Sequence, residues 1–126
     1  MARVSGGWDW ELSVAGKRVR YASVMEQYFQ KVEGVARADD RREVLEAVTV
    51  HGSDIAFSLN ITLEGLGLTR HEFSGKVDRE QIVGTVTLTP MNGTSMTLPW
   101  RAQRTARSAY FAPTGTTLFQ PPAAGR

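Results

Sequence analysis

The sequence predicts an all-β protein, an antiparallel up-and-down β-barrel of about eight strands. Three observations lead to this prediction. Apolar and polar residues alternate along most of the chain, as expected for strands with one buried and one exposed face. The alternating segments recur at intervals of about eight to twelve residues, which is typical of sandwiches and barrels. Short turns join the segments, and successive hairpins of similar length close most simply into a barrel, which removes exposed edges.

The alternation is clear in the first half of the chain. Apolar residues take every second position from Trp8 to Val14, and the pattern resumes from Val19 to Met25 after a turn at Ala15-Gly16. The strongest case is Ile55–Ile61, which follows a turn at His51–Asp54. We therefore predict that each of these segments is a strand with one face in the core.

Three further strands are expected in the second half. His71–Val77 and Ile82–Leu88 alternate, and the second of them carries β-branched threonines on its polar face. Asn92-Gly93 predicts a type I′ hairpin turn, because both residues tolerate positive φ. The return strand, Met96–Trp100, contains Pro99, which has no amide hydrogen for a ladder. Pro99 should therefore lie at an edge, or its nitrogen should point away from the neighbouring strand.

The segment from Met25 to Leu45 allows two interpretations. Met25, Tyr28, Phe29 and Val32 also fit helical spacing, and the polar run that starts at Asp39 could open a helix. The alternation of residues 32–37 favours strands instead. We interpret the segment as strands with a hairpin turn at Asp39-Asp40, followed by a strand over Val44–Val50, and leave the helical alternative open.

Length and composition indicate one globular domain. The chain has 126 residues, of which 41% are hydrophobic and 22% charged, close to globular averages. We expect a leader at residues 1–6, the barrel at 7–104 and a flexible tail at 105–126. In that tail, Tyr110, Phe111 and Phe119 could alternatively fold back onto the barrel mouth.

The chain shows no sign of secretion or of a membrane span. It contains no run of about 18 uncharged apolar residues and no apolar signal segment at its start. We therefore expect a cytoplasmic protein without a membrane partner. The absence of cysteine excludes disulfides and thiolate sites.

The sequence offers little for catalysis, metals or nucleic acids. With only two histidines and no His-x-x-His spacing, a zinc site is not expected, and no catalytic residues are assigned. Gly65-Leu66-Gly67 lacks the third glycine of a dinucleotide loop. The net charge is +2, and every residue charged at neutral pH beyond Glu80 is an arginine. The chain has no stripe of lysine and arginine interleaved with aromatic residues, of the kind that stacks single-stranded bases, so no nucleic-acid partner is expected.

The parity of the strands suggests a candidate ligand cavity. His71 shares the inward face of its strand with Phe73, and an interior imidazole could orient a ligand or act as a base. The alternatives are a hydrogen-bonded structural histidine and a packed aromatic core, since an eight-stranded barrel is narrow enough for side chains to fill. Glu46 shares parity with neighbouring valines, so it is a buried acid, a residue near the rim or part of a helix misread as a strand. The candidate cavity residues, to which Trp10 could be added, are Trp8, Tyr21, Phe57, His71, Phe73 and Trp100.

Five spaced segments carry a resemblance to a known group of proteins. They are Ala2–Trp10, Gln27–Gly34, Phe73–Val77, Ile82–Val86 and Pro99–Arg104. With these segments the sequence resembles the β-rich region that follows the catalytic domain in a group of bacterial class I S-adenosylmethionine-dependent methyltransferases. The resemblance covers about Ala2 to Arg104. The nucleotide-binding half of those enzymes, with its glycine-rich loop and acidic ribose-binding residue, is absent from this chain.

The resemblance implies a C-terminal accessory domain rather than an enzyme. Such a domain would cover the methyl-transfer site or bind the substrate, with the catalytic domain of the parent chain as its partner. S-adenosylmethionine would then be a cofactor of the parent enzyme, and this chain alone would hold no cofactor. The alternative is a free-standing lipocalin- or streptavidin-like barrel that binds a small apolar ligand. An enzyme that uses His71 and Glu46 has little support.

Overall fold

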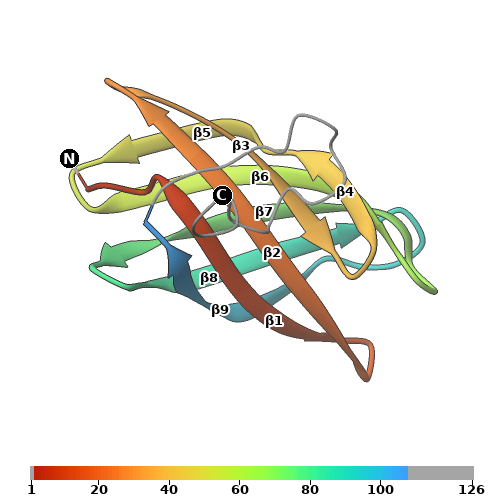
Figure 1. Ribbon diagram of the computed structural model, residues 1–126. Helices are drawn as coiled ribbons and strands as arrows, with labels where there is room; N and C mark the ends of the chain where they lie inside the picture. The colour runs from red at the N-terminus through yellow and green to blue at the C-terminus, as the bar shows by residue number, and fades with distance from the viewer. Residues whose placement is uncertain (1, 108–126) are drawn as a thin grey trace.

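The computed structural model describes residues 2–107, and all of its regular structure is β-strand. Nine antiparallel strands form one sheet that curls into a nearly closed barrel (Figure 1). This confirms the predicted fold class. The strands are β1 Gly6–Val14, β2 Lys17–Tyr28, β3 Lys31–Ala38, β4 Arg41–Val44, β5 Glu46–His51, β6 Asp54–Leu63, β7 Gly67–Asp78, β8 Gln81–Pro90 and β9 Met96–Ala106.

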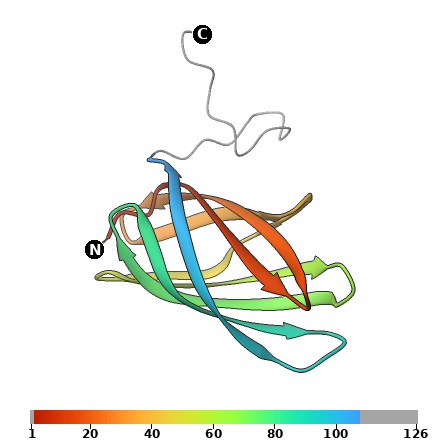
Figure 2. The same cartoon turned by 90° about the horizontal axis from the view of Figure 1, so that it is seen from below.

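The strand order is that of an up-and-down meander joined at its ends. The order in the sheet is β4-β3-β2-β1-β9-β8-β7-β6-β5, so the first and last strands of the chain lie side by side. Figure 2 shows this single curved layer from below. Residues 108–126, which include most of the expected tail and its three aromatic residues, lie outside the described part of the chain. Within that part, β9 continues to Ala106.

The strand expected over Val44–Val50 is divided, which explains nine strands instead of eight. Its first part, β4, pairs with β3, and its second part, β5, pairs with β6. Leu45 lies at the junction, where its amide donates to the carbonyl oxygen of Gly34 at 2.9 Å. A Cβ on Gly34 would lie 2.5 Å from the carbonyl oxygen of Val24 and 3.0 Å from Leu45 Cδ1, so glycine allows the close approach of β2 and leaves room for this leucine in the wall. Ala47 has a φ of 53°, and the register of β5 shifts beside it.

The strand interpretation of Met25–Leu45 is confirmed. β2 continues to Tyr28, a turn follows at Phe29 and Gln30, and β3 returns along β2. The Asp39-Asp40 turn is present as expected. Helical spacing was misleading because Tyr28 and Phe29 lie at the exposed end of a hairpin instead of facing the core.

Two local predictions have different outcomes. Pro99 pairs with Thr85 of β8, whereas β9 pairs with β1 only at residues 103–106, so Pro99 interrupts no ladder on that side. The prediction of a type I′ turn at Asn92-Gly93 is wrong. The loop between β8 and β9 is longer, and of these two residues only Gly93 has a positive φ. Thr89 and Ser95 join the strand ends by a side-chain hydrogen bond of 3.1 Å.

The N-terminal segment seals one end of the barrel. Val4 is fully buried, and its carbonyl oxygen accepts a hydrogen bond from Trp8 Nε1 at 2.9 Å. The side chain of Gln27 bonds to the segment twice, accepting from the Val4 amide and donating to the Ala2 carbonyl. Residues 2–5, expected to be a leader, therefore pack as part of the barrel.

Arg104 holds this seal in place. Its side chain is only 5% exposed, and its guanidinium lies 4.3 Å from the centre of the Trp8 ring. The nitrogens donate to the carbonyls of Ser5 at 2.8 Å, Arg3 at 2.7 Å and Arg79 at 3.1 Å. Glu80, 3.8 Å away, supplies the opposite charge. One side chain thus joins the N-terminal segment to the β7–β8 turn.

Replacing Arg104 should therefore destabilise the whole barrel. We expect Arg104→Met to lower the free energy of unfolding by about 3 kcal/mol, because several hydrogen bonds from a charged group are lost together. Urea unfolding followed by tryptophan fluorescence would measure the change. Arg104→Lys should recover only part of the loss, since an ammonium cannot reproduce the planar fork. A loss below about 0.5 kcal/mol for Arg104→Met, the range of neutral surface changes, would contradict the role given to this residue.

Candidate functional site

The candidate aromatic residues form the centre of the barrel. Five of the six lie in mutual ring contact, with Phe57 and Phe73 stacked at 4.7 Å and Phe73 and Trp100 4.8 Å apart. Trp10 lies among them and contacts four of their rings at 5.3 to 6.4 Å. Trp8 is the exception, since it lies at the sealed end under Arg104. Rings in this contact fill the central layer with side chains.

His71 occupies the inward position that its parity predicted, and both of its ring nitrogens are engaged. Nδ1 lies 3.0 Å from the carbonyl oxygen of Thr69, and Nε2 lies 2.7 Å from the hydroxyl of Tyr21. A carbonyl can only accept, so Nδ1 carries the proton and Nε2 accepts from the tyrosine. The arrangement requires a neutral imidazole and a protonated phenol.

Burial reinforces these protonation states. Loss of solvent lowers the pKa of His71 to about 4, although the carbonyls of Thr69 and Leu59 act in the opposite direction. Burial, with a smaller effect of Asp39, raises the pKa of Tyr21 above its usual range. Neither group exchanges protons near neutral pH, so the pair is suited to holding β2 against β7 and poorly suited to general acid or base catalysis.

Two buried donors in the same layer lack acceptors. Trp10 Nε1 and Trp100 Nε1 have no hydrogen-bond partner among the described residues. The two indoles meet edge to face, with ring centres 5.6 Å apart. Their immediate surroundings are aromatic rings, which accept hydrogen bonds only weakly.

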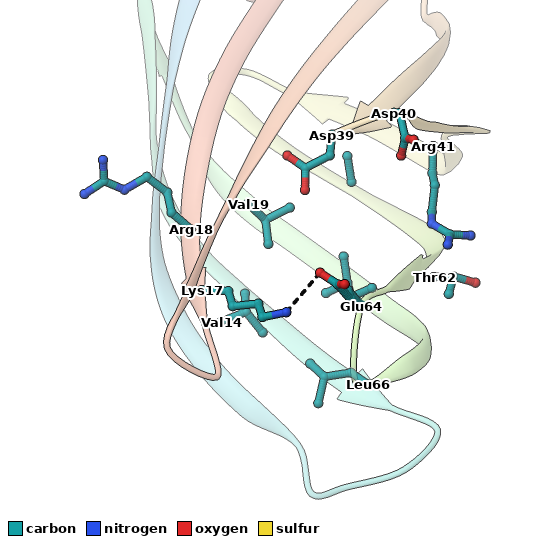
Figure 3. Close-up of a pocket in the computed structure, with 12 residues that line it drawn as sticks. Val14, Lys17, Arg18, Val19, Asp39, Asp40, Arg41, Thr62, Glu64 and Leu66 are labelled. Carbon is teal, nitrogen blue, oxygen red and sulfur yellow. Dashed lines mark hydrogen bonds and ion pairs between the residues drawn. The ribbon is translucent and has the colours of Figure 1, made fainter.

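The open end of the barrel contains a pocket that sequence reasoning did not identify. It has a volume of about 370 Å³ and lies between the β1–β2, β3–β4 and β6–β7 turns (Figure 3). Val14, Val19 and Leu63 are buried apolar residues of its lining. Its charged lining residues are Lys17, Arg18, Asp39, Asp40, Arg41 and Glu64.

An ion pair crosses the rim of this pocket. Lys17 Nζ lies 2.9 Å from Glu64 Oε1, which joins the β1–β2 turn to the β6–β7 turn (Figure 3). The hydrogen bond and charge of Lys17 lower the pKa of the Glu64 carboxyl below its usual value. Both side chains are mostly exposed, at 60% and 84%, so the pair contributes little to stability and can open for a ligand. The sequence signal was weak because the two residues flank separate turns.

The remaining titratable candidates lie outside the barrel interior. Glu46 is exposed and accepts a hydrogen bond from Asn60, so the suggestion of a buried acid is wrong. His51 is also exposed. Residues 2–107 contain no group of three or more histidine, aspartate or glutamate side chains that could hold a metal ion.

Comparisons with known proteins do not assign this chain to a family. No family model, curated protein or solved structure matches the chain. Among the described residues, no helix is long and apolar enough to cross a membrane. The class that fold and site define is an antiparallel β-barrel with a filled centre, one sealed end and one pocketed end.

The buried histidine should make stability fall in acid. Above about pH 6.5, His71 is neutral in both states. Between about pH 6.5 and pH 4 the unfolded chain binds a proton that the folded chain does not. The free energy of unfolding should therefore fall by up to about 3 kcal/mol across this window, on the basis of about 1.4 kcal/mol per pKa unit.

The measurement is urea unfolding at a series of pH values for the wild type and His71→Gln. Glutamine can donate to Thr69 and accept from Tyr21, but it does not titrate. The difference between the two proteins isolates the histidine from the carboxylates. Parallel curves for the two proteins between pH 4 and 6.5 would mean that His71 titrates normally and is not held neutral.

Proposed function

We propose that this chain is a non-catalytic β-barrel domain that binds a small molecule, or part of one, at its open end. We further propose that it serves as the substrate-side accessory domain of an S-adenosylmethionine-dependent methyltransferase of the group its sequence resembles. One observation carries the proposal: the barrel is sealed at one end, filled at its centre and hollowed by a pocket of about 370 Å³ at the other end.

The central layer supports a non-catalytic role. A general base needs a free nitrogen or oxygen near the reacting proton and a pKa near the working pH. The two nitrogens of His71 are bonded to Thr69 and Tyr21, and its pKa of about 4 leaves it a weak base. Methyl transfer would therefore depend on a catalytic domain outside this chain.

The chemistry of the pocket indicates the class of ligand. Buried valine and leucine side chains favour an apolar body, while Lys17 and Glu64 offer one charge of each sign at the rim. A small zwitterion with an apolar body could contact the apolar lining and pair with both Lys17 and Glu64, in place of the ion pair that these two residues form with each other. The pocket volume lies near the lower end of the range of about 300 to 1,000 Å³ for small-molecule sites.

The second candidate is a free-standing lipocalin-like barrel that binds a small apolar ligand. The buried side chains of Val14, Val19 and Leu63 in the pocket favour it. Such a ligand would occupy the mouth, because the candidate aromatic residues already pack against one another. The charged rim is the feature that this alternative does not explain.

Three probes with the same ring and different charges distinguish the candidates. L-phenylalanine, phenethylamine and 3-phenylpropionate would be titrated into the ¹⁵N-labelled chain, and amide shifts followed by NMR. We expect weak binding, with a Kd of about a millimolar, and shifts confined to the turns that carry Lys17, Asp39 and Glu64. The zwitterion should bind at least about threefold more tightly than either singly charged probe, since only it meets both charges.

Matched variants test the origin of that preference. Lys17→Gln should remove it, whereas Lys76→Gln should not, although Lys76 forms a similar exposed ion pair with Asp54. Equal binding of all three probes would favour the apolar-ligand barrel. An absence of shifts at the mouth would contradict both candidates.

The accessory role also predicts that S-adenosylmethionine does not bind this chain alone. Its adenine, ribose and sulfonium are usually held by a glycine-rich turn and a carboxylate, whereas Gly65 and Leu66 lie in the turn between two antiparallel strands and Gly67 begins the second of them. Isothermal titration should be flat up to about a millimolar, which corresponds to binding weaker than about −4 kcal/mol. A saturable micromolar isotherm would place a cofactor site in the barrel and overturn the accessory role.

A further inference from the structure

An apolar row crosses the outer wall of the barrel beside its sealed end. Residues that lie directly opposite each other in an antiparallel pair face the same side of the sheet. Trp8, next to Gly7 in β1, faces the core, so Gly7 and the residues opposite it face outward. The row across β1 to β4 consists of Gly7, Val24, Val35 and Val44. Three adjacent strands therefore each place a valine on the outside of the barrel.

Val24, in the middle of this row, is covered although it faces outward. It is only 4% exposed, and among the described residues it is not part of the buried core cluster. Val83, at an outward position of β8, is 43% exposed, and Val44 at the end of the row is 56% exposed. A position within the sheet therefore does not by itself bury an outward valine. The burial of Val24 points to a group that lies against the outer wall.

The chain itself supplies a suitable segment at the start of this row. Ala106, the last residue of β9, pairs with Gly7 on the side of β1 away from β2. The residues that follow from 108 to 125, which we call the C-terminal segment, contain no charged side chain. They include Tyr110, Phe111 and Phe119. An uncharged segment with aromatic residues therefore begins beside an apolar row that it could cover.

Distances along the row fit the first two of these aromatic residues. Neighbouring strands lie about 4.8 Å apart, so Val24 is about 10 Å and Val35 about 14 Å from Ala106. An extended chain advances about 3.3 Å per residue, which places Tyr110 up to about 13 Å and Phe111 up to about 17 Å beyond Ala106. A segment that crosses the strands at right angles therefore brings this aromatic pair over Val24 and Val35.

We propose that the C-terminal segment docks across the outer wall of β1, β2 and β3, with Tyr110 and Phe111 covering Val24 and Val35. β1 and β2 cross the front of the barrel in Figure 1, so this wall faces the reader. The row leads into an apolar groove of about 380 Å³ that Val35 and Val44 help to line, which offers a seat for an aromatic ring. The docked segment occupies this wall, so a partner domain must contact the barrel on another face, such as the open mouth.

Thiol labelling of the full chain tests the cover. The chain has no cysteine, so Val24→Cys introduces a single reporter, and Val83→Cys is the matched reporter at an exposed outward valine. We expect iodoacetamide to modify Val24→Cys at least about tenfold more slowly, because labelling requires the segment to lift. Adding Tyr110→Ser and Phe111→Ser should accelerate labelling of Val24→Cys at least about tenfold and leave that of Val83→Cys unchanged.

A second reporter guards against a variant that fails to fold. Tryptophan fluorescence should be the same for each variant as for the wild type, because the aromatic core is untouched. Val35→Cys, at a half-buried position of the same row, replaces Val24→Cys if that variant does not fold. The same serine substitutions should accelerate its labelling as well.

Nuclear Overhauser contacts test which residues make the cover. The ring protons of Tyr110 and Phe111 should show contacts with the methyl groups of Val24 and Val35. They should show none with the methyl groups of Val83, which lies on the other side of β9. Ring contacts with Val83 instead of Val24 would place the segment on the wrong wall and overturn the proposal.

Three labelling results would also overturn it. The first is labelling of Val24→Cys as fast as that of Val83→Cys, which would mean that the wall is open. The second is slow labelling that the serine substitutions do not change, which would assign the cover to the barrel itself. The third is protection that increases with protein concentration, which would assign the cover to a second copy of the chain.

Discussion

The buried guanidinium of Arg104 is the interaction on which the rest of the structure depends. It stacks on Trp8 and donates to three carbonyls from two separate segments, so one planar group closes the end of the barrel. The carbonyl dipoles and Glu80 offset the cost of removing this charge from water. Because this end is sealed, the opposite mouth and the seam beside Leu45 are the places where other molecules can approach the interior.

The aromatic centre has a comparable influence on function. In a barrel with eight strand positions, large rings from β1, β6, β7 and β9 meet across the axis and fill it. The pocket therefore lies at the mouth and not at the centre, and there aliphatic residues replace the rings and charged turns surround them. The hydrogen-bonded His71 and Tyr21 lie within the filled layer and link β2 to β7 across it.

The residues that carry the resemblance to the methyltransferase-associated region have structural contacts. Trp8, Gln27 and Arg104 build the sealed end, and Gly34 admits Leu45 into the wall. Shared positions of this kind would conserve a barrel shape while leaving the mouth free to differ. The proposed ligand site accordingly rests on residues outside those motifs, such as Lys17 and Glu64.

The sequence by itself determined the strands and their inward faces. Alternation is a local property, so it predicted the barrel, the inward position of His71 and the aromatic interior, with five of the six proposed residues in contact. The tertiary structure decided everything that depends on which strands become neighbours. Lys17 meets Glu64, and Arg104 meets Ser5, only because the sheet curls until distant turns share one end. The division at Leu45 likewise arises because β4 pairs with β3 whereas β5 pairs with β6. No local sequence pattern indicates where the pairing partner changes.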